Sequence, residues 1–323
     1  MSTQSINVTV LIPTYDRFDF LVSAVTTTLN GSSSSKILII DDDSALAIKE
    51  QLVPIIPPSQ HERIAVVRNA SNCGEIESLR IGLRLIDTEY FVILADDDQI
   101  SEGFLDRGVE ILNSDKSVKC FIGGYEIRDS SGIQREVRMP ECLGRTMSRL
   151  SPACAIKNAR AGKLPLAWSG FVFRTTTLRE VTLKGWLDRG FGTDIDFVLH
   201  VLLTGDVIVS RVIGVVYCQH DNTTTGLNVH QCDERFLYWI RMRFESLYAS
   251  TSEPEIKREL LQWYEQILPT GFRKRTLISL LRFLKSNSAE HDLFTCSRAA
   301  VYHNLPISVV KIIYILFNLI FRR

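Results

Sequence analysis

Apolar residues along the first third of the chain fall into two alternating patterns. Four segments contain a nearly continuous apolar run that ends at polar or turn-forming residues: 7–13, 36–44, 63–69 and 90–98. Such short runs are typical of strands buried on both faces. Three other segments have apolar residues at helical spacing. Two lie between these runs, at 20–31 and 75–86, and one follows the last run, at 103–113. The alternation predicts an α/β fold with a parallel sheet that is covered by helices on both faces.

The pattern changes in the middle of the chain. Further strands are indicated in three segments: 119–140, 168–181 and 207–220, the last as two short strands. Residues 191–205 place an acidic turn before an apolar helix, and from residue 233 onward the pattern is helical. We therefore predict a first domain over residues 1–230 and a C-terminal helical region over residues 231–323.

Three consecutive aspartates, Asp96, Asp97 and Asp98, follow the fourth of these strands. Ligands of open parallel sheets bind beyond the carboxyl ends of the strands, where these side chains are expected to lie. Mg²⁺ takes oxygen ligands and commonly binds one or two carboxylates together with substrate phosphates. A solvated turn is the alternative, but three adjacent like charges carry a cost that a cation would remove. We therefore favour a metal site.

Two further acidic groups lie at element ends. Asp41, Asp42 and Asp43 end the second strand, where they either accept hydrogen bonds from a nucleotide or cap the next helix. Asp194 and Asp196 begin an apolar helix, where the helix dipole favours negative charge. One of the two could instead be a general base beside the metal site. The residue pattern alone leaves these choices open.

Taken in chain order, the segments resemble the family 2 glycosyltransferases, which are inverting enzymes of the GT-A fold. Six stretches carry the likeness: VLIPTYDR, IIDDDSA, NASNCGEIESLRIGL, the DXD-like FVILADDDQISEGFL, WSGFVFRTTTL and GTDIDFVLHVLLTG. They span roughly residues 8–221. The resemblance implies the GT-A fold, with a Rossmann-like mixed, mainly parallel sheet that carries helices on both faces. It also implies transfer of a sugar from a nucleotide-diphosphate sugar.

Carried over by position, the resemblance also implies a role for single residues. The nucleotide would be bound by Pro13, Tyr15, Asp42, Arg80 and Asp96. Asp42 would contact the N–H edge of the base. Mg²⁺ or Mn²⁺ would be held at the diphosphate by Asp97, Asp98 and His220. Asp194 would be the catalytic base, and the sugar or acceptor pocket would include Trp168 and Asp196. A structural role is the alternative for both Trp168 and His220, and for a lone histidine it is the more common one.

Three positions depart from the family pattern. Ala95 replaces the usual first Asp of the DXD segment, Glu102 replaces a common Pro, and Thr193 replaces the Glu that precedes the catalytic Asp. The first change makes Asp97 the main expected metal ligand. The last removes a carboxylate that would support Asp194.

Composition limits the class of protein. Lys plus Arg and Asp plus Glu number 37 each, so the formal net charge is zero, which argues against a nucleic-acid binder. Seven cysteines without a CxxC pair are typical of reduced thiols in a cytoplasmic protein. The first residues lack the basic and apolar regions of a signal peptide.

The strongest apolar run lies at residues 305–323. Its polar residues fall on one stripe at helical spacing, the pattern of a helix lying in a membrane interface: Ser308, Lys311, Asn318 and Arg322. Residues 271–323 hold nine Lys and Arg but two Asp and Glu, and such charge attracts anionic lipid. We expect a peripheral protein on the cytoplasmic face of the inner membrane; docking of this helix on protein is the alternative.

These features predict a hexosyltransferase-type glycosyltransferase that prefers a UDP-sugar. The expected acceptor is a glycan or a polyprenyl-diphosphate-linked saccharide in cell-surface polysaccharide synthesis, such as O-antigen. A Mg²⁺-dependent phosphotransfer or signalling domain is one alternative, which the chain length and the PTYDR and GTDIDF stretches oppose. An inactive GT-A-like binding module is the other, and the intact Asp97 and Asp194 oppose it.

Overall fold

The computed structural model describes residues 7–141, 145–181, 193–219 and 243–267. The chain forms two compact units, Met1–Gly226 and Leu227–Arg323, and each is described by itself. The predicted boundary between residues 230 and 231 lies outside the described residues, as does the apolar tail at 305–323.

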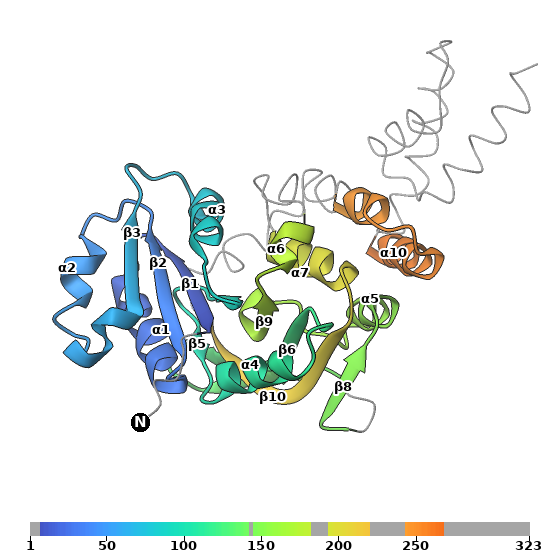
Figure 1. The fold of residues 1–323 in the computed structure, drawn as a ribbon, viewed down its shortest axis with the longest axis horizontal. Coiled ribbons are helices and arrows are strands. Elements are labelled where there is room, and N and C mark those ends of the chain that lie inside the picture. Colours follow the sequence, from blue (N-terminus) through green and yellow to red (C-terminus); the bar gives the residue numbers. More distant parts are fainter. Residues whose placement is uncertain (1–6, 142–144, 182–192, 220–242, 268–323) are drawn as a thin grey trace, which may run out of the picture. The chain divides into compact units, whose positions relative to one another are not determined.

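The first unit is built on one ten-stranded sheet (Figure 1). Four neighbouring strands form a parallel block in the order β3-β2-β1-β4: β1 Val8–Thr14, β2 Ser35–Asp41, β3 Ile64–Arg68 and β4 Tyr90–Ile93. β1 lies between β2 and β4, and all of its residues are buried. Since the strands are parallel, the carboxyl ends of β1, β2 and β4 meet at one edge of the sheet. The acidic groups that follow β2 and β4 therefore lie at this edge.

Beyond β4 the sheet continues in the mixed order β9-β6-β10-β5, with β7 paired to β6 and β8 paired to β10. The bounds are β5 Gln99–Ile100, β6 Cys120–Asp129, β7 Gln134–Arg138, β8 Met147–Leu150, β9 Phe171–Arg174 and β10 Val207–Gln219. β9 is antiparallel to β4 and to β6, and β10 is parallel to β6. Consequently β6 and β10 run in the direction of the parallel block, as expected for a mixed, mainly parallel sheet.

Two helices cover one face of this sheet. α1 (Phe18–Gly31) and α4 (Phe104–Ser114) pack into a single buried cluster with the β1 side chains that point to that face, Val8, Val10 and Ile12. Gly108 lets α4 approach closely, because a Cβ built there would lie 2.6 Å from Val172 Cγ2 and 3.0 Å from Phe121 Cδ1. The helix is therefore fitted tightly to β9 and β6.

Two other helices cover the opposite face. α3 (Glu75–Leu85) directs Gly82 at Leu11, whose side chain alternates with those facing α1. α7 (Thr193–Leu203) places Phe197 5.1 Å from Phe173 in β9, between ring centroids. Burying an aromatic side chain of this size stabilises the fold by roughly 1.5–3 kcal/mol. The predicted helices on both faces are thus observed.

The remaining elements are short. They are α2 Ile48–Leu52, η1 Pro58–Arg63, α5 Pro152–Arg160, η2 Trp168–Gly170 and α6 Thr177–Glu180. The expected pair of strands at 207–220 is a single strand, β10, whose pairing with β6 shifts register between Val209 and Val215. A bulged strand absorbs the shift and stays in the sheet.

The described part of the second unit is helical. Residues 243–249 form one helix and α10 spans Pro254–Ile267. The ring of Phe244 lies 5.6 Å from Trp263 and 5.7 Å from Tyr264, between centroids, so aromatic contacts join the two helices. Among the residues that the structure describes, none of the helices combines the length and the hydropathy needed to span a bilayer.

Candidate active site

The three aspartates after β4 lie in a tight turn. The amide of Asp98 donates to the carbonyl oxygen of Ala95 over 3.1 Å, so Asp96 and Asp97 occupy the two central positions of the turn. Because the chain reverses within four residues, the three carboxylates reach different partners. Adjacent residues of one type therefore have different surroundings.

Arg17 bridges Asp96 and Asp97. It lies between β1 and α1, and its Nη1 is 2.8 Å from Asp96 Oδ1 and 3.1 Å from Asp97 Oδ2. Thr14, the last residue of β1, donates its hydroxyl to Asp96 Oδ2 over 2.8 Å. Burial alone would lower the pKa of Arg17, but the two carboxylates outweigh burial and raise it. Burial also raises the pKa of Asp96, although Arg17 and Thr14 favour its charged form.

Asp98 points into the protein. It is 1% exposed, its Oδ2 accepts a hydrogen bond from Ser169 Oγ over 3.1 Å, and its Oδ1 accepts one from the amide of Cys218 over 3.4 Å. Burial, followed by the charge of Asp97, raises the pKa of Asp98 well above its ordinary value. Asp98 thus ties the acidic turn to η2 and to β10.

Asp42 organises the loop between β3 and α3. Its Oδ1 accepts hydrogen bonds from Asn69 Nδ2 at 2.8 Å and from the amide of Cys73 at 2.9 Å, and its Oδ2 accepts the amide of Gly74 at 2.7 Å. Gly74 has a φ of 87°, a conformation that favours glycine. Burial alone would raise the pKa of Asp42, but these hydrogen bonds outweigh burial and lower it. The start of α3 is thereby fixed to the end of β2.

The other residues predicted to bind the nucleotide lie nearby in the fold. Pro13 is buried in β1, and Tyr15, directly after that strand, is 47% exposed. Arg80 lies on α3 and forms an ion pair with Glu77 of the same helix. The sheet edge thus brings together Pro13, Tyr15, Asp42 and Asp96, whereas Arg80 lies on the adjoining helix.

The first turn of α7 brings Asp194 within electrostatic reach of the acidic turn. Burial, followed by the charges of Asp98 and Asp194, raises the pKa of Tyr217 in β10. Much of Glu75 is exposed, but partial enclosure of its carboxyl group, followed by the charge of Asp194, raises the pKa of Glu75. Asp194 and the acidic turn therefore act electrostatically on the same two residues, Glu75 at the start of α3 and Tyr217 in β10.

Asp196 and Trp168 lie in the protein interior. Asp196 is 2% exposed, and its Oδ1 lies 3.6 Å from Nδ1 of His200, one turn along α7. Trp168 is 8% exposed at the start of η2. The structure therefore does not bring these two side chains to the solvent-facing edge with Asp194. His220 lies outside the described residues.

Asp96 and Asp97 have the chemistry of a divalent-cation site. One carboxylate oxygen from each converges on a single point, and a positively charged nitrogen of Arg17 lies at that point. Mg²⁺ and Mn²⁺ bind such hard oxygens and complete their coordination with water and phosphate. Within the described part of the chain, no group of three or more His, Cys, Asp or Glu side chains could hold a metal. Further ligands would therefore have to come from substrate, water or other residues.

Sequence reasoning did not include four residues of this site: Thr14, Arg17, Glu75 and Ser169. Thr14 and Arg17 could have been predicted from the sequence. Thr14 is the last residue of β1 and Arg17 follows that strand, so both lie at the edge where the acidic turn was expected. Ser169 carried none, because its hydrogen bond to Asp98 joins residues 71 positions apart.

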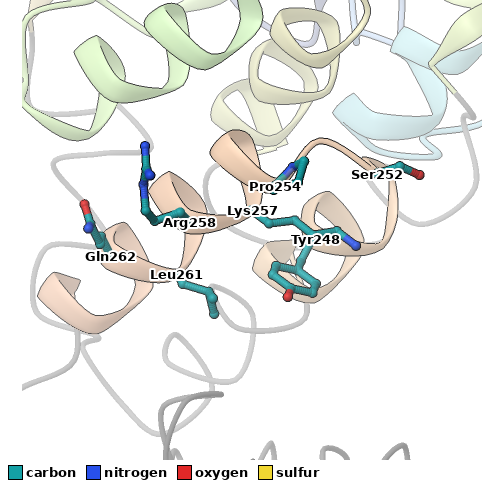
Figure 2. Close-up of a pocket in the computed structure, with 7 residues that line it drawn as sticks. All are labelled: Tyr248, Ser252, Pro254, Lys257, Arg258, Leu261 and Gln262. Atoms are coloured by element: carbon teal, nitrogen blue, oxygen red, sulfur yellow. The ribbon is translucent and has the colours of Figure 1, made fainter.

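The second unit contains a pocket of its own (Figure 2). Seven described residues line it, among them Lys257 and Arg258, and none of the seven has a carboxylate. Lys257 Nζ lies 4.8 Å from the centre of the Tyr248 ring. The lining described here thus lacks the acidic chemistry found at the sheet edge.

Comparison with known proteins places this geometry in context. A family model described as glycosyl transferase family 2 matches residues 9–160, a little under half of the chain. The matched segment runs from β1 to the end of α5 and includes Arg17, Asp42 and the acidic turn. No curated protein matches the chain.

Solved structures of S. aureus TarS, residues 1–349, are similar in fold. One has 14% sequence identity and a TM-score of 0.59, over 81% of this chain and 72% of that chain. The complex with UDP-GlcNAc has 14% identity and a TM-score of 0.60, over 81% and 73%. The complex with UDP has 13% identity and a TM-score of 0.55, over 80% and 69%. At these identities the likeness concerns the fold alone; the predicted fold class and the resemblance to family 2 are confirmed.

Proposed function

We propose that this chain, a glycosyltransferase with a family 2 segment at residues 9–160, uses a UDP-sugar as donor. It transfers the sugar to an acceptor hydroxyl with inversion at the anomeric carbon. One observation carries the proposal: Asp42 and the Asp96–Asp97 pair follow β2 and β4 at one edge of the sheet, and Asp194 acts electrostatically on Glu75 together with Asp96 and Asp97. They would supply a nucleotide contact, a cation site and a general base.

Asp42 has room for one more hydrogen-bond donor. Its Oδ2 accepts the amide of Gly74, and a carboxylate oxygen has two lone-pair directions, so Oδ2 can also accept an N–H of the base. The exposed ring of Tyr15 offers an aromatic face beside it. UDP is the first choice because S. aureus TarS, of similar fold, has been solved with UDP and with UDP-GlcNAc.

The proposed cation is Mg²⁺ or Mn²⁺, held by Asp97 with Asp96. When bound, it would neutralise the negative charge of the departing diphosphate. Asp98 is assigned a different task, because its carboxylate is engaged by Ser169 and Cys218 in the interior. Its contacts support the turn that presents Asp96 and Asp97.

Asp194 is the proposed base. Its position in the first turn of α7 favours the charged carboxylate, since the amino end of a helix is positive. The acceptor hydroxyl gives its proton to this carboxylate, and the oxygen forms a bond to the anomeric carbon from the side opposite the diphosphate. The bond from that carbon to the diphosphate oxygen breaks, and its electron pair leaves with the diphosphate. A single displacement of this kind inverts the anomeric configuration.

The proposed acceptor is a glycan or a polyprenyl-diphosphate-linked saccharide at the cytoplasmic face of the inner membrane, used in cell-surface polysaccharide synthesis. Support comes from the sequence of the tail, which combines an apolar run with an excess of basic residues. A protein that works on a lipid-linked acceptor gains from being held at the membrane surface.

A donor-hydrolysis screen tests the proposed function. The full chain is incubated with UDP-, GDP- and dTDP-sugars with Mn²⁺, and release of the nucleoside diphosphate is measured beside calorimetric titration of each nucleotide. We expect UDP to bind and a UDP-sugar to be hydrolysed. Absence of both for every nucleotide would contradict the proposal. Binding without any turnover would identify an inactive binding module.

A further inference from the structure

Arg17 lies where a cation bound by Asp96 and Asp97 would lie. Its Nη1 is within 3.1 Å of a carboxylate oxygen from each residue. Its guanidinium carbon also lies 5.4 Å from the centre of the Phe20 ring, within range of a cation–π contact. The side chain is 28% exposed, so its head group has a path to solvent.

We propose that Arg17 is an internal counter-ion of the acidic turn, and that a divalent cation binds Asp96 and Asp97 only by exchanging with it. The inference rests on the metal site of the proposed function. The same two oxygens cannot serve a guanidinium nitrogen and a dication at once, because two positive charges at such short range repel. Arg17 therefore sets how tightly the turn binds metal.

The exchange couples the metal to the donor. A displaced guanidinium carries a fork of N–H donors that matches phosphate oxygens, and the donor diphosphate brings such oxygens to this edge. The diphosphate thus gives Arg17 a new partner and adds ligands for the cation. Thermodynamic linkage then requires that UDP tightens Mn²⁺ binding and that Mn²⁺ tightens UDP binding by the same factor.

A purely structural role for Arg17 makes the opposite prediction. If Arg17 only fastens the start of α1 to the turn after β4, its removal loosens both carboxylates. Metal binding then stays the same or weakens. If Arg17 competes with the cation, its removal strengthens metal binding.

Mn²⁺ titration followed by electron paramagnetic resonance separates these roles. Full-length wild type, Arg17→Gln, Arg17→Lys and the control Arg68→Gln are titrated with and without UDP. Arg68 lies within 2.9 Å of Asp41 and 2.7 Å of Asp43, so its variant removes a similar charge from a neighbouring acidic group. Without UDP we expect Arg17→Gln to bind Mn²⁺ at least about tenfold more tightly than wild type, Arg17→Lys to be intermediate, and Arg68→Gln to change by less than about twofold.

Thermal melting supplies a second measurement. Mn²⁺ should raise the Tm of Arg17→Gln more than that of wild type, because the variant binds the cation without displacing a side chain. If Arg17→Gln does not fold, Arg17→Lys and the wild type decide: wild type must bind Mn²⁺ more tightly with UDP than without it.

Three outcomes would overturn the exchange. Unchanged or weaker Mn²⁺ binding by folded Arg17 variants would show that Arg17 does not compete. Equal strengthening in Arg68→Gln would show a general effect of charge. Failure of every variant to bind Mn²⁺, with or without UDP, would remove the metal site and the exchange together. Donor hydrolysis in that last case would still leave the proposed sugar transfer in place.

Discussion

Asp97 and Asp98 are neighbours, yet replacing each by Asn should have unequal effects on Mn²⁺ binding. Asp97→Asn removes a hard oxygen at the point where Arg17 lies, so Mn²⁺ binding in the presence of UDP should weaken by about tenfold or more. Asp98→Asn removes a buried charge but keeps groups that can hydrogen-bond Cys218 and Ser169, so binding should change by less than about twofold. Mn²⁺ titration measures both, and equal losses would contradict the division of roles.

Asp194→Asn should abolish transfer while sparing the nucleotide. An amide cannot take the acceptor proton, so kcat should fall by about 10²- to 10⁴-fold, while the Kd for UDP stays within about twofold. Asp87→Asn is the matched control, because this 72% exposed carboxylate precedes β4, at the opposite edge of the sheet. Steady-state kinetics and calorimetry measure both variants. Wild-type turnover in Asp194→Asn would rule out the assigned role.

Asp42 should stabilise the fold in a pH-dependent way. Its pKa is lowered in the folded chain, so its contribution is present above the ordinary carboxyl pKa of about 4 and is lost as the pH falls through the lower, folded pKa. In Asp42→Asn the side-chain NH₂ group would face a backbone N–H, and two donors cannot form a hydrogen bond with each other. The substitution should lower the free energy of unfolding at pH 7 by about 1–3 kcal/mol. Urea unfolding from pH 7 to pH 3 should show this deficit shrinking with acid; a constant deficit would contradict the carboxylate's role.

The place of a site residue could be predicted from the sequence where the residue directly follows a parallel strand. The sequence placed Asp42 and the acidic turn at one edge because parallel strands end together. It could not separate Asp98 from Asp97, since the partners of Asp98 come from η2 and β10, far along the chain. Nor could spacing show that Asp196 packs inward beside His200, while Asp194 and the acidic turn both act electrostatically on Tyr217.

At the scale of elements, α4 is fitted tightly against β9 and β6. In Gly108→Ala the new methyl group would overlap Val172 and Phe121, both fully buried. Overpacking costs about 1–3 kcal/mol, whereas Ala gains about 1 kcal/mol in helix propensity, so the free energy of unfolding should fall by up to about 2 kcal/mol. Glu110→Ala, at an exposed position of α4, is the control for urea unfolding. A stabilised Gly108→Ala would show that α4 can move outward without cost.

Element prediction was limited by tertiary pairing. The apolar runs of β1, β2 and β4 were clear because these strands are covered on both faces. β8, with the sequence MSRL, has no apolar run and exists as a strand because it pairs with β10. Two short strands were expected over residues 207–220, but β10 continues as one strand through its irregular register with β6.

At the scale of the whole molecule, we propose from the sequence that residues 305–323 attach the protein to a membrane. Deleting them should move the protein from the membrane fraction to the soluble fraction, because the apolar face of the expected interfacial helix is lost. Hydrolysis of a UDP-sugar in solution should be retained, since the proposed catalytic residues lie in the first unit. Fractionation and the hydrolysis assay measure the two effects. Retention of the truncated protein on membranes would assign the attachment to another segment.

The loop held by Asp42 has a consequence for the entropy of donor binding. Hydrogen bonds from Asn69, Cys73 and Gly74 to Asp42 order this loop without a nucleotide, so the loop should lose little conformational entropy when a base binds to it. The diphosphate, in contrast, reaches an edge where Arg17 must first exchange partners. On the proposed mechanism the two ends of the donor are therefore recognised differently: the base enters a loop that is already ordered, and the diphosphate reaches a site where one arginine side chain changes partners.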